Sequence, residues 1–472
     1  MTQPPPDLFH LSPAERRALL AKLLQQRAGK LPSSPPLQQL GTRALDRFAI
    51  PVTDLAAEVV LDPNIRPDKL PAESPRLPTH IFLTGATGFL GAFLLHELLQ
   101  QTEATIHCLV RCASVQEGVR RIDRNLQAYM PGHAHDLSRI IPIGGDLSHP
   151  LLGLSRDQFD ALGSHIDTVY HNGATVNWIY SYSRLKPANV LGTHEIIRLA
   201  SHRRIKPLHL VSSVSVFPLI VDAQPAVVRE QDSLDHGGVL YGGYTQSKWV
   251  AERVATVARH RGLPVTIYRP GIISGHSQTG AWNTDDFTSR LIKSWIELGS
   301  APDLDGATDM TPVDYVSRAV VHLSLSECAP ASVFHLINPQ QVHLREIVAA
   351  IRSSGYPIEQ VTYAKWRAEL LGRAERSTVR GGYSLLPLFS ASGSANAGAE
   401  KDVRDGNGRT TVDQIGSMMA AQYAARSVTF DDHHAQTGLS GTSIMCKRVD
   451  GEVLERCLSY LVRVGFLPPP VR

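Results

Sequence analysis

Tyr244 and Lys248 have the types and the spacing to perform acid–base chemistry together. Residues four apart on a helix share one face, so the lysine ammonium would lie beside the phenol. A positive charge there favours phenolate and lowers the tyrosine pKa, which permits proton exchange near neutral pH. We expect this pair to be catalytic; the alternative is a surface tyrosine beside a solvated lysine.

The segments around the pair favour the catalytic interpretation. Before it, an apolar run ends in Ser212-Ser213-Val214-Ser215, where a hydroxyl can hydrogen-bond the oxygen of a reacting carbonyl. After it, a second apolar run ends in Tyr268-Arg269-Pro270-Gly271. The order and spacing of these segments fit a single site, in which we expect Tyr268, Pro270 and Gly271 to contact a cofactor.

A glycine-rich turn lies between an apolar run that ends at Thr84 and a helical stretch over 92–100. In dinucleotide-binding turns, one glycine allows a tight turn, one lets the backbone approach the pyrophosphate, and one lets helix and strand pack closely. The helix N-terminus then favours the anion. We therefore predict that this turn holds a nucleotide cofactor through Thr84, Gly85, Thr87, Gly88, Phe89, Leu90 and Gly91.

The second expected strand ends in Cys108-Leu109-Val110-Arg111. Enzymes that bind NAD place a carboxylate near this point to hold the ribose 2′-hydroxyl. Here an arginine stands in that place, and a guanidinium suits a 2′-phosphate by charge and geometry. Arg111, with Arg121 as a second cation, therefore favours NADPH, although a solvated strand-end charge is the simpler alternative for Arg111.

Two further strand ends complete the expected cofactor site. Asp146 and Leu147 follow the third strand, where an adenine contact would fall. Asn172, Gly173 and Ala174 end the fourth strand, where small residues let the cofactor pass. Each signal is weak alone, and their order along the chain makes them support one another.

Apolar runs alternate with helical patterns over most of the chain, which predicts an α/β fold with a doubly wound, Rossmann-type parallel sheet. We expect an N-terminal helix (12–27) and linker over 1–40, a nucleotide-binding domain over 41–340, and a smaller, mainly helical subdomain over 341–472. Residues 390–428 are small and polar at first, and a closing helix is expected at 451–464. The expected strands are 80–84, 105–110, 140–144, 168–171, 209–212, 265–269 and 333–337.

Composition excludes several classes of protein. A hydrophobic content of 43% over 472 residues allows a large core, and a net charge of +3 argues against binding nucleic acid or a membrane surface. Five dispersed cysteines form no disulfide framework. Asp431-Asp432-His433-His434 has metal-ligand residue types but no matching segment, so we expect no metal site. With no signal peptide or membrane span evident, we expect a cytoplasmic protein.

Together these motifs resemble the extended short-chain dehydrogenases and, more narrowly, the thioester reductase domains of nonribosomal peptide synthases, polyketide synthases and carboxylic acid reductases. The resemblance extends from about residue 50 to the end of the chain. That family usually has threonine where Ser213 stands, and serine keeps the hydroxyl. The segments that carry the resemblance are 83–91, 108–111, 145–148, 171–174, 212–216, 244–252 and 268–271.

The resemblance implies a substrate and a partner. The substrate would be an acyl or peptidyl thioester on the phosphopantetheine arm of a carrier protein, reduced by NADPH to an aldehyde and possibly to an alcohol. Ser213, Tyr244 and Lys248 would be the catalytic residues, in a monomer or in the last domain of a larger synthase. The alternatives are an extended reductase or epimerase acting on a free molecule or an acyl-CoA, and a non-enzymatic Rossmann module.

Overall fold

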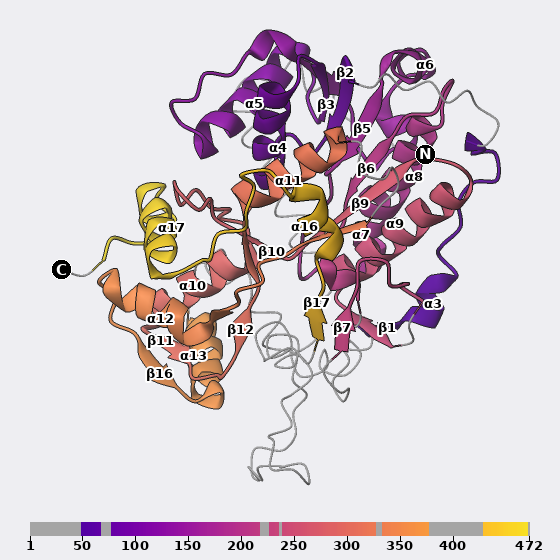
Figure 1. The fold of residues 1–472 in the computed structure, drawn as a ribbon. Coiled ribbons are helices and arrows are strands. Elements are labelled where there is room, and N and C mark those ends of the chain that lie inside the picture. Colours follow the sequence, from indigo (N-terminus) through magenta and orange to yellow (C-terminus); the bar gives the residue numbers. More distant parts are fainter. Residues whose placement is uncertain are drawn as a thin grey trace, which may run out of the picture.

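Seven apolar runs form one parallel sheet in the computed structural model, which describes residues 49–67, 77–217, 226–235, 238–326, 333–376 and 428–470 (Figure 1). All seven were predicted from the sequence, with ends that agree to within one residue. The strands are β2 (His80–Thr84), β3 (Thr105–Val110), β4 (Ile140–Gly144), β5 (Thr168–His171), β6 (Leu208–Val211), β9 (Val265–Pro270) and β14 (Val333–Leu336).

The order of the strands locates a binding crevice. Across the sheet the order is β14-β9-β6-β5-β2-β3-β4, and every neighbouring pair is parallel. Within this sheet, the first strand along the sequence is β2. The next two strands, β3 and β4, lie on one side of it, and the chain then crosses over to β5 on the other side. In such sheets, ligands bind beyond the carboxyl ends of the strands at this reversal point, which here lies between β2 and β5.

Helices cover both faces of the sheet, as a doubly wound fold requires. Successive strand residues point to opposite faces: Ile81 and Leu83 pack in one core, whereas Phe82 packs in the other. The first core is covered by α4 (Phe89–Gln101), α5 (Val115–Tyr129) and α11 (Val313–Leu325). The second is covered by α6 (Arg156–His165), α8 (Gly192–Ala200) and α9 (Gly243–His260).

A smaller, mainly helical part lies beside the sheet (Figure 1). Its strands pair across distant parts of the sequence: β11 with β16, β12 with β15, and β10 with β13. Between them the chain returns to the main sheet through α11 and β14, so this part draws on residues both before and after 340. Its elements are β10 (Ile272–Ser274), α10 (Phe287–Leu298), β11 (Ser300–Pro302), β12 (Ala307–Thr308), β13 (Met310–Pro312), β15 (Val342–His343), α12 (Leu344–Ser353), β16 (Glu359–Val361), α13 (Tyr363–Arg376) and α17 (Gly451–Arg463).

Shorter elements close the periphery. Strand β17 pairs with β7, and α16 packs against α11 and β14, so the chain after residue 428 rejoins the main sheet. The expected helix over 12–27 and most of segment 390–428 lie outside the described residues. Among those described, no helix is long and apolar enough to cross a membrane. The peripheral elements are β1 (Ala49–Pro51), α3 (Val52–Ala56), α7 (Tyr182–Lys186), β7 (Ala226–Val228), β8 (Val239–Tyr241), β17 (Val428–Phe430) and α16 (His433–Leu439).

Candidate active site

The glycine turn has the close contacts that require glycine. Gly85 has a φ of 79°, and a side chain there would come within 2.9 Å of the Gly173 backbone. A side chain at Gly91 would lie 1.9 Å from the Gly85 carbonyl oxygen, so only glycine lets α4 approach β2 this closely. Asn125 fixes the turn from α5, because its Nδ2 donates to the carbonyls of Ala86 (3.1 Å) and Gly88 (3.0 Å). The sequence had not indicated Asn125.

The first turn of α4 has the features of an anion site. Gly88 is the N-cap of this 13-residue helix, and the first turn contains no acidic residue. The first backbone N–H groups of a helix have no acceptor within the helix, and the helix dipole favours an anion at this end. Phe89 packs its ring against Phe93 and Tyr129, away from the backbone donors. These features fit a pyrophosphate.

A buried network joins β2 to β5 at the reversal point. Thr84 Oγ1 accepts from the Gly173 backbone N–H (2.8 Å) and contacts His171 Nδ1 (2.9 Å). His171 Nε2 meets Thr193 Oγ1 at 3.0 Å. Burial lowers the pKa of His171 to about 3, so this imidazole is neutral. Thr84 therefore holds the end of β2 against the segment after β5. The small residues Gly173 and Ala174 belong to that segment, just beyond the last residue of β5.

Arg111, Arg121 and Asp146 gather at the ends of β3 and β4. Arg111 is exposed, and the guanidinium of Arg121 donates to its carbonyl oxygen. Asp146 accepts from both the backbone and the hydroxyl of Ser148, each at 2.8 Å. Burial opposes ionisation of Asp146, but these hydrogen bonds and the charge of Arg111 bring its pKa below the usual value. The predicted phosphate-binding cation and the predicted adenine contact are thus neighbours.

A left-handed turn over 151–153 holds the backbone of Asp146 in place. Leu151, Leu152 and Gly153 have φ values of 50°, 61° and 74°, and the Asp146 N–H donates to the Leu152 carbonyl at 2.8 Å. Two leucines in this region are uncommon and carry strain. The buried Leu152 side chain and the bond from the Leu151 N–H to Glu195 (3.0 Å) hold the turn in place.

Tyr244 and Lys248 both lie on α9, one turn apart; Lys248 is buried, whereas Tyr244 is partly exposed. The Nζ of Lys248 donates to the Val211 carbonyl at 2.6 Å, at the end of β6. Burial lowers the pKa of Lys248 to about 8, against the charge of Glu252, which raises it. Burial also raises the pKa of Tyr244 to about 12. The expectation that the lysine would lower the tyrosine pKa is therefore wrong for this structure, because desolvation dominates and the ammonium binds a carbonyl.

Ser213 lies two residues after the end of β6, at the N-cap of a short 3-10 turn (Val214–Val216). Its Oγ accepts the backbone N–H of Ser215 at 3.1 Å. A hydroxyl has one proton to donate besides its acceptor positions, so this contact leaves the Ser213 proton available to a carbonyl oxygen. The neighbouring Ser212 is buried and donates to Glu252 instead, which distinguishes the two serines.

Asn189 links the segment after β5 to α9, and sequence reasoning missed it. It lies in a π-helical turn (Pro187–Leu191), a form that often marks functional sites. Its side chain accepts from the Thr175 N–H (2.7 Å) and donates to the hydroxyl of Ser247 (2.9 Å). Ser247 in turn donates to the Tyr244 carbonyl at 2.8 Å. The proline within a helical pattern was the available signal.

A buried ion pair supports the same helix from the other side. Glu252, one turn after Lys248, accepts from Arg269 of β9 at 2.5 and 3.0 Å, and both side chains are almost fully buried. Arg269 also donates to the Glu230 carbonyl (3.2 Å) and meets His335 Nε2 of β14 (3.2 Å). The ion pair therefore joins α9 to β9, to β14 and to the segment after β7.

The remaining predicted residues occupy different environments. The ring of Tyr268 is fully buried, contacts His209 Nδ1 through its hydroxyl (3.1 Å), and stacks on Phe334. Its backbone carbonyl accepts from the Ser212 N–H at 2.6 Å. Pro270 ends β9, and a side chain at Gly271 would lie 2.0 Å from Asp309. Leu147 packs against Gly173.

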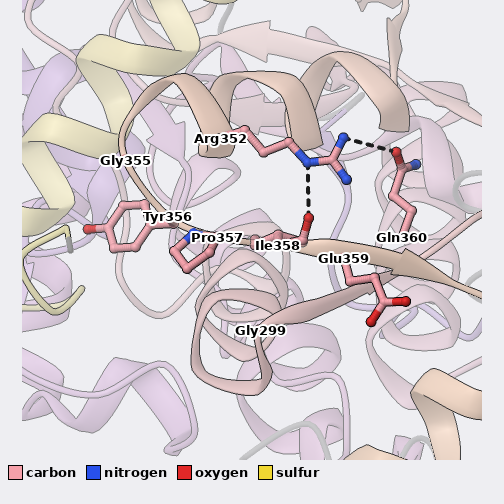
Figure 2. Close-up of a pocket in the computed structure, with 8 residues that line it drawn as sticks. All are labelled: Gly299, Arg352, Gly355, Tyr356, Pro357, Ile358, Glu359 and Gln360. Carbon is pink, nitrogen blue, oxygen red and sulfur yellow. Dashed lines mark hydrogen bonds between the residues drawn. The ribbon is translucent and has the colours of Figure 1, made fainter. Parts of the chain in front are cut away.

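The ring of Trp178 packs beside Tyr244. Its ring centroid lies 5.6 Å from that of Tyr244 and 5.7 Å from that of Phe287 on α10, which belongs to the smaller part. A separate open groove of about 1010 Å³ lies between α12 and β16. Figure 2 shows Arg352 there, donating to Ile358 and Gln360. No residue of the predicted site lines that groove.

Comparison with known proteins assigns the family. The model of the male sterility protein NAD-binding family matches residues 83–320. The chain is 40% identical to a linear gramicidin synthase of Brevibacillus parabrevis over 88% of its length, and 36% identical to isonitrile lipopeptide synthase of Streptomyces coeruleorubidus over 98%. It spans only 8% and 29% of these two relatives.

A solved structure matches the chain more completely. The terminal R domain of the myxalamid polyketide–nonribosomal peptide pathway is 43% identical, with a TM-score of 0.76 over 89% of this chain and 99% of that one. The Rossmann-type fold and the resemblance stated from the sequence are therefore confirmed. The chain is an oxidoreductase domain that belongs to the male sterility protein NAD-binding family, among the reductase domains of nonribosomal peptide and polyketide synthases.

Proposed function

We propose that this domain uses NADPH to reduce an acyl or peptidyl thioester, carried on the phosphopantetheine arm of a carrier protein, to an aldehyde. A second round would reduce the aldehyde to an alcohol. The observation that carries the proposal is the match along almost the whole of a terminal reductase domain. The Tyr244–Lys248 pair supports it, because both residues lie on α9 and Lys248 binds the carbonyl at the end of β6.

Some residues of the site would bind the cofactor, and others would act on the substrate. The glycine turn and the N-terminus of α4 would hold the pyrophosphate, and Arg111 would hold the 2′-phosphate. Lys248, now on the Val211 carbonyl, would reach the nicotinamide ribose. When bound, NADPH supplies the hydride that reduces the carbonyl carbon.

The chain's own groups handle the oxygen and the proton. Ser213 and Tyr244 would donate hydrogen bonds to the thioester oxygen as negative charge develops on it. Tyr244, with its pKa at about 12, is protonated at neutral pH and transfers that proton to the oxygen. The hemithioacetal then loses its hydroxyl proton as the carbon–sulfur bond breaks. This step releases the carrier thiol and leaves the aldehyde.

Substitution of Tyr244 tests the proton step. Tyr244→Phe should lower turnover by about 10²–10⁴-fold, since a positioned general acid contributes that much, while the dissociation constant of NADPH changes little. Tyr356→Phe is the matched control, because Tyr356 donates to the Pro468 carbonyl in the remote groove. If Tyr244→Phe and Tyr356→Phe both keep turnover within a few-fold of normal, α9 does not provide the catalytic proton.

The carrier is tested with matched substrates. The same acyl group is offered on a carrier protein, on coenzyme A and on a short thiol mimic, with NADPH consumption, aldehyde and alcohol all measured. We expect kcat/KM to be highest on the carrier, because binding energy far from the carbonyl helps to position it. Equal values on all three handles would leave a general reductase and exclude the carrier.

A further inference from the structure

Three histidines from distant parts of the sequence meet near the amino-terminal ends of the strands, whereas the candidate active site lies at the carboxyl ends. His80 begins β2, His107 lies within β3, and His165 ends α6. In the register of β2 and β3, Phe82 is the partner of His107. Residues two apart on a strand point to the same face, so His80 shares the face of Phe82. Both imidazoles therefore lie on the face of the sheet that α6 covers. His80 lies about 13 Å along β2 from Thr84, at 3.3 Å per residue.

The distances between the rings suit a metal ion. His80 Nδ1 lies 3.3 Å from His107 Nε2. The His80 and His165 ring centroids lie 3.8 Å apart, closer than two imidazoles on one metal ion, so His165 must turn away from the His80 ring to coordinate. One ligand nitrogen from each ring lies within 4.8 Å of the other two. A tetrahedral zinc ion with Zn–N bonds of about 2.0–2.1 Å separates its ligand nitrogens by roughly 3.3 Å.

We propose that His80, His107 and His165 form a binding site for a divalent transition metal, with Zn²⁺ as the reference ion and solvent in the fourth position. Neutral imidazoles suit Zn²⁺, Ni²⁺ and Cu²⁺. The site lies at the amino ends of the strands, so its metal links β2, β3 and α6 and takes no part in hydride transfer.

The surroundings prepare the rings for a metal. His107 is almost fully buried, and its Nδ1 has no hydrogen-bond partner among the described residues. Its Nε2 points to His80, so this nitrogen is the one that would bind the metal.

Asp167 fixes the backbone beneath the cluster. One of its carboxylate oxygens accepts from the His80 N–H at 2.9 Å and from Thr79, and the other accepts from Arg204 at 2.7 Å. The carboxylate is therefore a support for β2. Since His165 is exposed, the remaining coordination position opens to solvent.

The test compares two histidine groups in the tag-free chain. Zn²⁺ affinity is measured by competition with a chromophoric chelator, and Co²⁺ by its visible absorption. His165→Ala removes an exposed ligand without opening the core. His135→Ala is the matched control, because His135 Nε2 meets His96 Nδ1 at 3.1 Å in a separate group.

We expect one tight site in the unmodified chain and in His135→Ala, weakened at least about tenfold in His165→Ala. Zn²⁺ should raise the Tm of the first two proteins and not of the third. No tight site in the unmodified chain, an unchanged affinity in His165→Ala, or an equal loss in His135→Ala would each overturn the proposal.

Discussion

At Lys248, burial and charge act in opposite directions. The protein interior disfavours the ammonium and brings its pKa down to about 8, although the carboxylate of Glu252 raises it. Tyr244 is only partly buried, yet desolvation also raises its pKa to about 12. The two groups therefore move toward the states that the proposed reaction needs, a proton-bearing phenol and a lysine that is charged only below about pH 8.

The difference between the pKa values of Tyr244 and Lys248 predicts the pH dependence of the enzyme. Activity that needs the Lys248 ammonium should be full well below pH 8 and fall as pH rises through about 8, where a lysine with this lowered pKa loses its proton. Tyr244 remains protonated throughout that range. The measurement is kcat/KM from pH 6 to 10, with thermal stability followed as a control. A flat profile to pH 10 would contradict this role of Lys248.

Arg111 should determine the choice of nucleotide. It is exposed at the end of β3 beside Asp146, in the place where NAD enzymes keep a carboxylate. Arg111→Ala should weaken NADPH binding by about 1.5–3 kcal/mol, the contribution of a charge-assisted hydrogen bond, and leave NADH almost unchanged. Dissociation constants for both nucleotides check this, with NADH as the internal control. Equal affinities in the unmodified protein would rule it out.

At the scale of elements, α9 connects the reactive groups to the core. It carries the tyrosine, the lysine, Ser247 and Glu252. Ser247 accepts from Asn189, whereas Lys248 and Glu252 both bond to the end of β6, at Val211 and Ser212. Glu252 provides the deepest anchor through its buried pair with Arg269. Removing one partner of such a pair leaves the other charge buried without compensation.

We therefore expect Glu252→Ala to lower the free energy of unfolding by about 3–5 kcal/mol. Glu452→Ala is the control, since it breaks an exposed pair with Arg456 (2.8 Å) and should cost less than about 1 kcal/mol. Urea denaturation measures both. The double variant Glu252→Leu/Arg269→Met should be less damaged than Glu252→Ala; equal small losses in all three would mean that the pair does not support α9.

At the scale of the whole molecule, the end of the chain returns to the main sheet. Glu230, which follows β7, accepts from the N–H groups of His335 (2.9 Å), His434 (2.5 Å) and Ala435 (3.1 Å). Its carboxylate thus caps α16 and binds β14 at once. Burial raises the pKa of Glu230, so these three donors compensate a carboxylate that is held away from water.

Loss of Glu230 should release this docking. Glu230→Ala leaves two buried donors and one half-buried donor without their acceptor, at about 1–3 kcal/mol for each buried donor, and amide exchange over 428–439 should accelerate. Asp450→Ala is the control: it removes the cap of α17, where Asp450 accepts from Val453 (3.1 Å), and should leave 428–439 unchanged. Hydrogen exchange with mass analysis reads both segments. Slow exchange over 428–439 in Glu230→Ala would show that other contacts hold it.

The sequence by itself determined the sheet, the glycine turn and the Tyr244–Lys248 helix. These features depend on local patterns: short apolar runs, glycine spacing, and residues four apart. The family followed from the same segments. The N-terminal helix, the choice of NADPH and the carrier remain predictions.

Only the tertiary structure decided which distant residues meet. Asn125 reaches the glycine turn across 37 residues, Asn189 reaches Ser247 across 58, and Glu252 finds its arginine on a different element. The raised pKa of Tyr244 also emerges only there, because desolvation depends on packing from every side. Three scattered histidines likewise become a cluster when β2, β3 and α6 pack together. A sequence orders neighbours along the chain, whereas burial and charge act through space.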